Sequence, residues 1–428
     1  MVGLNAKLDT PLSNQAEVTL IGGTSGYGES VVIRYSANDW AIIDSCFDTA
    51  TKKCLPLDYL REIGVNIEQQ VKYVFCTHWH DDHIKGLHTI LKACSKETVF
   101  CVAIASDRLN FLYEIERSNL FDPDRGARRE LILAMEVASS KGMKVKRLLQ
   151  DLVVFKSDNC ECYALSPSQK EIESFFEELA SAMSIKKTIG VQKDKLSTIS
   201  EKVIESAEDI SSRAFASLQE DFDITGDQIE QEVQLSEKVF KNNIRAQKGH
   251  LNDRSAALLF SIQGHHIVLG ADLEISSDSD CGWQSVNDCI CMKGIHASVF
   301  KIPHHGSHTG YCDFFIQNHI KSSATGKIST WFKGDKRLPE KNMVEKYFHH
   351  LPKLYITADP SLLICKFSSP DYRSIMEETT ESIVDIKNRI GIIRSRIDLT
   401  NGIDEWETKV FGTAILVTKE KLNLTISS

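Results

Sequence analysis

Four potential metal ligands stand within six positions of one short stretch, residues 71–87, which reads VKYVFCTHWHDDHIKGL. They are His78, His80, Asp82 and His83, and they directly follow an apolar, β-rich run. Because a strand end can direct several side chains of one tight loop at a single point, we interpret this stretch as a metal site. Imidazole and carboxylate ligands together favour a borderline metal such as zinc. The alternative, a surface loop that is rich in histidine by chance, does not account for the buried-type strand before it.

Other predicted strands also end at residues that can bind a metal. Asp44, Asp272 and the pair His304 and His305 follow the strands that we predict at residues 40–43, 266–269 and 297–302. These residues are far apart in the sequence, so only a fold that brings strand ends to one edge can use them together. Two ions about 3.5–4 Å apart would use such a set, with a carboxylate such as Asp272 between them. A bridging water would then lose its proton near neutral pH and become the nucleophile.

The composition is that of an ordinary soluble globular protein. The chain has 428 residues, of which 42% are hydrophobic and 25% charged, so it can bury a large core in two domains or one decorated domain. The net charge of −9 argues against a broad basic surface for nucleic acid, although it leaves room for a local basic groove.

The cysteine pattern and the termini indicate the compartment. The twelve cysteines form no CxxC pair, and the only close pairs are Cys160/Cys162 and Cys289/Cys291. The N-terminus has no signal peptide, and no apolar run has the length of a membrane-spanning helix. We therefore expect reduced thiols in a cytoplasmic protein.

Strands and helices alternate along most of the chain and predict an α/β layer arrangement. Strands are expected at residues 17–21, 30–35, 40–43, 71–77, 98–105, 152–155, 162–165, 256–262, 266–269, 297–302 and 353–357. Helices are expected at residues 57–63, 84–94 and 107–141. A hairpin of residues 413–417 and 422–426 is expected to close the chain.

Two charged stretches predict helical insertions. Apolar residues recur at three- and four-residue spacing in residues 169–248, and residues of about 370–405 are similarly charged and helical. We therefore divide the chain into a first half at 1–168, an insertion at 169–248, and a second half at 249–428 that carries the shorter insertion. We expect most of the long insertion to pack on itself or on the core; a dimerisation arm and a substrate lid are the alternatives.

The HxHxDH motif resembles that of the metallo-β-lactamase superfamily. Further motifs resemble the soluble domain of ComEC-type competence DNA-uptake channels, in the same order, over about residues 16–165 and 250–310. They are Gly28-Glu29-Ser30, Ile42-Ile43-Asp44-Ser45, Asn252 followed by Ser255, Leu269-Gly270-Ala271-Asp272 and Ile302-Pro303-His304-His305-Gly306-Ser307. The two helical stretches do not match this pattern.

The resemblance implies an αββα sandwich with two divalent metal ions at its edge, Zn²⁺ first and Mn²⁺ second. It implies that His78 and His80 hold one ion, that Asp82 and His83 hold the other, and that Asp272 bridges them. His305 is the preferred last ligand, with His304 as the alternate. Asp44 matches an aspartate that orients the ligand loop.

One departure from the superfamily pattern concerns the first ion. Many members have a further histidine ligand before the bridging aspartate, and here only His250 lies near that place. His250 either completes the first site or is an exposed loop histidine. A weaker first site leaves the metal identity open between zinc and manganese.

The ligand set predicts metal-assisted hydrolysis. A phosphodiester is the leading substrate because two ions can stabilise both the attacking and the leaving oxygens. We expect catalytic roles for Asp82, Asp272 and His308. Lys301, Ser307 and His308 flank the predicted ligands and could contact phosphate or protonate a leaving group, or could be plain surface residues beside the site.

The resemblance to the competence-type branch implies a nucleic acid or a nucleotide as the partner, and a nuclease effector in antiviral (phage) defence would fit a free-standing enzyme of this type. The first alternative is hydrolysis of an ester, thioester or lactam at the same site. The second is a non-catalytic scaffold that assembles, as a homodimer or with another protein, through its helical insertions. The intact ligand set argues against the scaffold.

Overall fold

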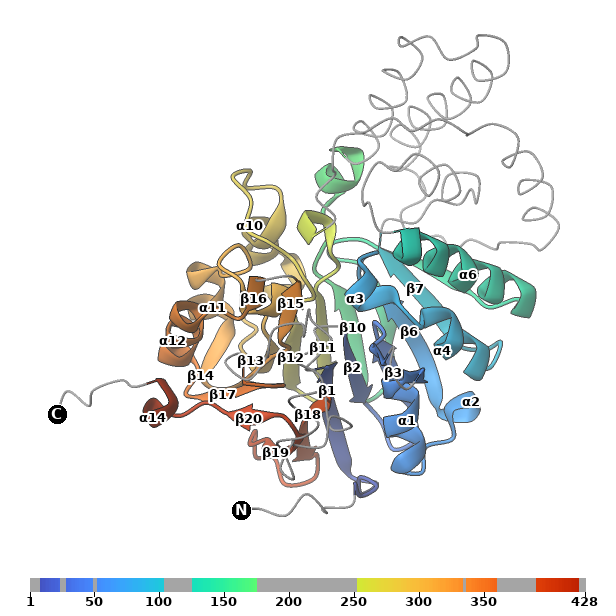
Figure 1. The fold of residues 1–428 in the computed structure, drawn as a ribbon, viewed down its shortest axis with the longest axis horizontal. Helices are drawn as coiled ribbons and strands as arrows, with labels where there is room; N and C mark the ends of the chain where they lie inside the picture. The colour runs from blue at the N-terminus through green and yellow to red at the C-terminus, as the bar shows by residue number, and fades with distance from the viewer. Residues whose placement is uncertain are drawn as a thin grey trace, which may run out of the picture.

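Two eight-stranded sheets face each other in the computed structural model (Figure 1). The structure describes residues 8–23, 28–48, 52–103, 125–174, 252–333, 336–359 and 390–422. The strands of the first sheet, in spatial order, are β19 (Glu407–Gly412), β18 (Ile390–Asp398), β1 (Gln15–Gly23), β2 (Glu29–Arg34), β3 (Trp40–Ile43), β6 (Val71–Cys76), β7 (Val99–Ala103) and β8 (Val145–Leu148).

The second sheet takes strands from both halves of the chain. Its spatial order is β20 (Ile415–Leu416), β17 (Lys353–Ile356), β14 (Ile320–Ile328), β13 (Ala297–Lys301), β12 (His265–Leu269), β11 (Leu258–Ile262), β10 (Cys160–Ala164) and β9 (Val153–Lys156). Two small hairpins stand apart: β4 (Phe47–Asp48) with β5 (Lys53–Cys54), and β15 (Trp331–Lys333) with β16 (Lys336–Leu338).

Helices cover the outer face of each sheet (Figure 1). On the first sheet they include α1 (Leu55–Glu62), α2 (Ile67–Gln70), α4 (Leu87–Ala93) and α6 (Arg125–Lys141), and on the second α10 (Gly282–Asn287), α11 (Asp313–His319) and α12 (Lys341–His350). Shorter pieces are α3 (Asp81–Ile84), α14 (Lys419–Leu422) and the 3₁₀ turns η1 (Asn252–Arg254), η2 (Ile290–Met292) and η3 (His304–Gly306).

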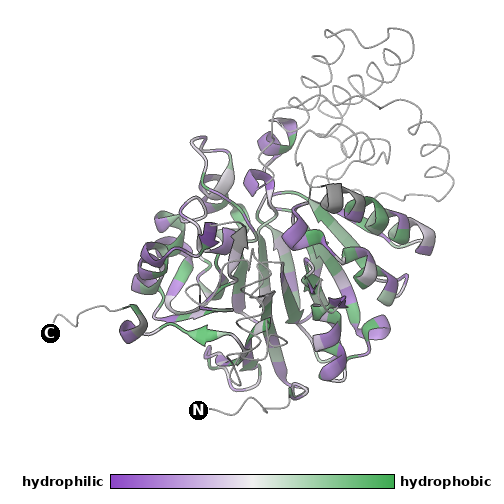
Figure 2. Cartoon of the chain, in the orientation of Figure 1, coloured by the Kyte–Doolittle hydropathy of each residue, from purple (hydrophilic) through white to green (hydrophobic). Residues whose placement is uncertain are grey.

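The alternation of side chains along the strands explains these layers. On β11, Phe260 packs in the cluster between the two sheets, while its neighbour Leu259 packs in the cluster beneath α10, α11 and α12. Between the sheets, the ring of Phe75 from β6 meets that of Phe260 edge-on at 6.0 Å. The hydrophobic strands therefore lie inside the molecule, and hydrophilic residues lie on the helices that cover them (Figure 2).

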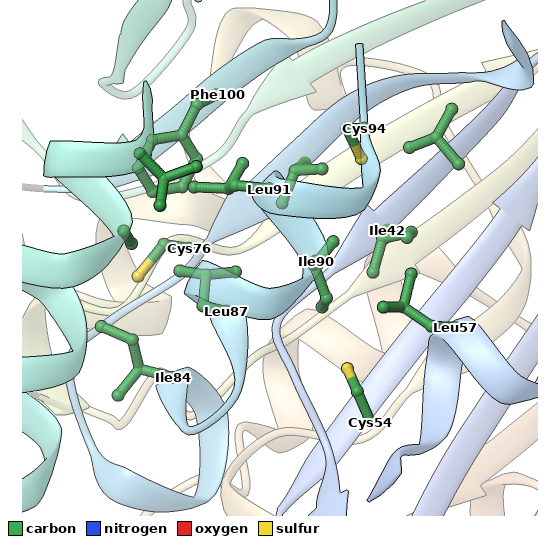
Figure 3. Close-up of a cluster of buried hydrophobic side chains, with 14 of the residues drawn as sticks. Ile42, Cys54, Leu57, Cys76, Ile84, Leu87, Ile90, Leu91, Cys94 and Phe100 are labelled. Atoms are coloured by element: carbon green, nitrogen blue, oxygen red, sulfur yellow. The ribbon is translucent and has the colours of Figure 1, made fainter. Parts of the chain in front are cut away.

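The cluster under α4 shows how a helix is fixed to the first sheet (Figure 3). Leu87, Ile90 and Leu91 of α4 are fully buried and face Ile42 and Phe100 of the sheet. Burying a side chain of this size stabilises the fold by about 1.5–3 kcal/mol. The helix that follows the histidine-rich loop is thereby held firmly on the sheet. The αββα fold expected from the sequence is confirmed.

The direction of the strands determines at which edge of each sheet the polar loops lie. β3, β6, β7 and β8 run parallel in the first sheet, and β12, β13, β14 and β17 run parallel in the second. Parallel strands deliver their carboxyl ends to the same edge of a sheet, which is where the predicted ligands stand.

The prediction of a helix over residues of about 370–405 is wrong for residues 390–398, which form β18 and pair with β1. Arg394 and Arg396 belong to the charged stretch that was predicted to be helical, and both are buried in the sheet. Arg394 binds Asp9, and Arg396 binds Asp9 and Glu17. Charged residues enter a sheet interior when they are paired in this way.

Of the expected closing hairpin, residues 415–416 form β20, which pairs with β17, and Leu422 ends α14 rather than starting a strand; residues 423–426 lie outside the described residues. β8 and β14 were not predicted. The greater parts of the two predicted insertions, residues 175–248 and 370–389, lie outside the described residues. Within the described ranges, no helix has the length and apolar character needed to cross a membrane.

Candidate metal centre

Four strand ends from the two sheets meet at one place. β3 leads into Asp44, β6 into the loop of His78 to His83, β12 into Asp272 and β13 into His305. A backbone hydrogen bond from Ala256 N to Thr77 O, at 2.9 Å, joins the start of the His78–His83 loop to the segment that leads into β11 of the second sheet. The φ angles of Asp44, Ala271, His304 and His305 are positive, between 44° and 59°. Such strained backbone persists only where the surroundings hold it, and it is characteristic of functional sites.

The first group of potential ligands is His78, His80 and Asp272. His78 Nε2 lies 3.1 Å from His80 Nδ1 and 3.9 Å from Asp272 Oδ2. His78 and Asp272 are buried, and His80 is half-buried. This group is open to solvent on the His80 side.

The second group also includes Asp272 and contains His83 and His305. His83 Nε2 lies 3.2 Å from Asp272 Oδ1. His305 Nε2 lies 3.1 Å from Asp82 Oδ2 and 3.6 Å from Asp272 Oδ2. Asp272 is therefore shared by the two groups.

The distances and the unsatisfied atoms both fit bound metal ions. Two atoms that bind one tetrahedral zinc ion at about 2.0–2.1 Å lie roughly 3.3 Å from each other. The spacings of His78 to His80 and of His83 to Asp272 are close to this value. His83 Nε2 and Asp272 Oδ1 are buried and make no hydrogen bond of regular geometry. Since buried polar atoms of this kind are normally satisfied, a cation between them would complete the site.

Asp44 holds the histidine-rich loop. Its carboxylate accepts hydrogen bonds from Thr77 N at 2.7 Å, from Thr77 Oγ1 at 2.6 Å and from His83 Nδ1 at 2.8 Å. Because Nδ1 of His83 donates to Asp44, Nε2 is the ring nitrogen left for a metal ion, and it lies 3.2 Å from Asp272 Oδ1. This contact agrees with the orienting role expected for Asp44.

His305 is oriented in a comparable way by residues of both sheets. Its Nδ1 lies 2.9 Å from Ser329 Oγ, and Ser329 in turn donates to Glu29. Glu29 also forms a buried ion pair with Lys301. His78 is positioned by hydroxyl groups instead, because its Nδ1 lies 3.2 Å from Ser255 Oγ.

Glu29 is the site residue that the sequence reasoning missed. It is buried, and one of its oxygens belongs to the same group of potential ligands as His83, Asp272 and His305. It stands in the Gly28-Glu29-Ser30 motif at the start of a buried strand, and a charged residue at such a position was the available signal. The suggestion that Lys301 contacts phosphate is wrong, since Lys301 is buried against Glu29.

The electrostatics favour the ligand forms of His78 and Asp272. Burial, with the nearby imidazoles of His83 and His80, lowers the pKa of His78 well below its usual value, so its ring is neutral. Burial raises the pKa of Asp272, but the charges of His83 and His305 outweigh this effect and bring it well below its usual value. Neutral imidazole and ionised carboxylate are the forms that bind metal. For His83, burial is outweighed by the charges of Asp272 and Glu29, which raise its pKa well above the usual value, so a metal ion would have to displace a proton from this ring.

The remaining predicted residues are placed differently. His304 faces away from both groups: its Nδ1 lies 2.7 Å from Glu274 Oε1, and its Nε2 lies 3.1 Å from Asn252 Nδ2. Ser307 is buried and its Oγ accepts a hydrogen bond from Gly310 N. His308 is exposed on the same loop. His250 lies outside the described residues.

Comparisons with known proteins agree with this architecture. The family model described as the Metallo-beta-lactamase superfamily matches residues 23–152. No curated protein matches the chain.

Two solved structures are similar at low identity. The metallo-beta-lactamase fold protein YhfI from Bacillus subtilis is 10% identical with a TM-score of 0.34, over 81% of this chain and 97% of that one. Zn²⁺-bound PqqB from Methylobacterium extorquens is 6% identical with a TM-score of 0.32, over 66% of this chain and 71% of that one.

The fold assignment rests on the family match and on the two facing sheets. The same match, together with the two ligand groups at the strand ends, indicates metal-dependent hydrolysis as the general class of reaction. Residues 23–152 match the metallo-β-lactamase superfamily, and the described chain forms the two facing sheets and outer helices of an αββα sandwich.

Proposed function

We propose that this protein is a metal-dependent phosphodiesterase that cleaves a nucleic acid or a nucleotide. The observation that carries the proposal is the position of Asp272, which belongs to both ligand groups. Two divalent ions held there would activate water and stabilise charge on the attacking and leaving oxygens. Phosphodiester cleavage makes the fullest use of such a pair because both oxygens develop charge in the same step.

We assign metal binding to the buried residues of the site and proton donation to an exposed one. His78 and His80 would hold one ion, and Asp82, His83 and His305 would hold the other, with Asp272 between them. His308 is exposed on the loop that carries His305, so it can reach a leaving group outside the buried ligands. We propose it as the proton donor.

A half-buried tryptophan beside the ligands supports a substrate with a planar ring. The indole of Trp331 is nearly parallel to the His305 imidazole, at 6.1 Å between ring centres and 21° between planes. Trp331 begins the small β15–β16 hairpin, two residues after Ser329, which lies between β14 and β15. A base could stack on this ring next to the reacting phosphate.

The net charge of −9 limits the length of nucleic acid that the protein is expected to contact. A chain with this charge is unsuited to neutralising many phosphates along a duplex. Local recognition at the metal centre and one aromatic ring therefore fits a short single strand or a nucleotide best. A role in phage defence remains an expectation from the sequence.

The experiment compares substrate classes on the purified full chain, loaded with Zn²⁺ or with Mn²⁺. The substrates are a generic phosphodiester, single-stranded and plasmid DNA, RNA, a dinucleotide and a chromogenic lactam. The variants His80→Ala and Asp272→Asn each remove one ligand. The matched controls His349→Ala and Asp158→Asn remove the same side-chain types from exposed positions.

Cleavage of a phosphodiester that both ligand variants lose and both control variants keep is the expected result. Activity toward the lactam or an ester alone would replace the proposal with the first alternative. A folded protein without metal and without any hydrolysis would support the scaffold.

A further inference from the structure

A third cluster of potential metal ligands lies among residues that the catalytic site does not use. It consists of Asp151, Cys289 and Cys291, with one ligand atom of each within 4.8 Å of the others. The two groups at Asp272 satisfy the same spacing. Cys289 and Cys291 are one of the two close cysteine pairs of the sequence, and the proposed hydrolysis gives them no role.

The three residues come from two segments that are distant in the sequence. Asp151 stands in the turn between β8, the edge strand of the first sheet, and β9, the edge strand of the second. Cys289 and Cys291 follow α10, in and beside η2. Cys291 N donates to Asp151 Oδ1 at 3.2 Å, which fixes the two segments to each other.

The backbone and a neighbouring amide aim these side chains inward. Asp151 has a φ of 61°, which an aspartate adopts at a cost that its surroundings must offset. Gln150 Nε2 donates to Cys289 Sγ at 3.1 Å. The same sulfur lies 3.5 Å from Leu165 O, so hydrogen bonds from both sides hold Cys289 in place.

A cation explains this arrangement better than a disulfide does. Two sulfurs and a carboxylate are all anionic as ligands, so their convergence in a half-buried place leaves negative charge that a cation would neutralise. A disulfide between Cys289 and Cys291 would leave the carboxylate of Asp151 beside the two sulfurs without a cation. Thiolates together with one carboxylate suit zinc, which normally takes four ligands.

We propose that Asp151, Cys289 and Cys291 form a structural site for Zn²⁺ or another thiophilic divalent ion, separate from the catalytic ligands. The ion would fasten the crossover between the two sheets to the segment after α10. Its binding would release the proton of each thiol that is still protonated, as the two sulfur–metal bonds form.

Cobalt separates this site from the catalytic one because both groups at Asp272 offer only nitrogen and oxygen atoms. The metal-free, reduced full chain is titrated with Co²⁺, and the near-ultraviolet thiolate-to-cobalt absorption is recorded. The band is expected in the wild-type protein, absent from the Cys289→Ser/Cys291→Ser variant, and weaker in apparent affinity in Asp151→Asn. Zinc analysis should find one fewer ion per chain in the double serine variant.

The other close pair supplies the matched control. Cys160 and Cys162 are buried between the sheets and belong to none of the ligand groups found among the described residues, so Cys160→Ala/Cys162→Ala should keep the band. A band that survives in the double serine variant would refute the proposal. The absence of the band from the wild-type protein would also refute the proposal, and this result does not depend on whether a variant folds. Mass spectrometry of the metal-free protein is a further test. If the peptide that contains Cys289 and Cys291 is lighter by the mass of two hydrogens, the two cysteines form a disulfide and the proposed metal site is wrong.

Discussion

Replacing Asp44 with asparagine tests how the fold prepares the metal centre. The substitution keeps the shape of the side chain, and its amide oxygen can still accept from Thr77 N. It removes the carboxylate oxygen that accepts from His83 Nδ1 at 2.8 Å. The amide nitrogen now donates to Nδ1, so the proton of the His83 ring moves to Nε2. That nitrogen is the atom 3.2 Å from Asp272, and in its protonated form it cannot bind a metal.

The expected loss follows from this change of tautomer. Removing the partner that orients a metal-binding histidine typically lowers metal affinity or activity by about 10–100-fold. That is about 1.4–2.7 kcal/mol of binding free energy. Asp44 is buried and contacts none of the ions directly in this scheme, so the effect must act through His83 and its loop.

The assay is a zinc titration in competition with a chromogenic chelator. Asp158→Asn, an exposed aspartate, is the control and should bind zinc like the wild-type protein. Circular dichroism and the thermal midpoint confirm that both variants are folded. Wild-type zinc affinity in a folded Asp44→Asn protein would refute the reasoning, because the tautomer of His83 would then not matter.

Three further predictions concern the buried charges and the aromatic ring. Burial lowers the pKa of Lys327 from 10.5 to about 7, with Glu17 opposing the shift, so the unfolded chain binds more protons above pH 7. The free energy of unfolding should therefore rise between pH 7 and about pH 10, by up to ~1.4 kcal/mol per pH unit, and Lys327→Met should flatten this slope in urea titrations. Glu29→Gln leaves Lys301 as a buried charge without its carboxylate and should cost about 3–5 kcal/mol in chemical unfolding, part of which Glu29→Gln/Lys301→Met should restore. Trp331→Ala should raise the KM for a dinucleotide by roughly 5–100-fold, as expected from about 1–3 kcal/mol of base stacking, while kcat changes little; an unchanged KM would remove the stacking argument.

The sequence predicted strands correctly where an apolar run leads directly into potential metal ligands. The strand of residues 71–76 was recognisable because apolar residues lead straight into the histidine-rich loop. The strands before Asp44, Asp272 and His304 were recognisable for the same reason. Because parallel strands share an edge, the convergence of their ends followed from the fold.

Paired buried charges account for what the sequence did not predict. β18 contains Arg394 and Arg396, which are buried only because Asp9 and Glu17 meet them across the sheet. β14 contains Lys327, whose ammonium reaches the backbone oxygens of Val18 and Ile393 in the other sheet. Partners so distant in the sequence leave no local pattern.

The candidate site shows the same division. The ligands on the HxHxDH loop were evident from their spacing, and the position of His305 before Gly306 favoured it over His304. Glu29 was missed because its neighbours, Lys301 and Ser329, come from the second sheet. A glutamate at the start of a buried strand indicated a paired charge, but the sequence did not show that its partners lie beside His83 and His305.

A zinc-loaded crystal of the full chain tests the central claim most directly, through anomalous scattering at the metal absorption edge. The account predicts two peaks about 3.5–4 Å apart on either side of the Asp272 carboxylate, one beside His78 and His80 and the other beside His83 and His305. A single peak, or peaks that do not contact Asp272, would contradict it.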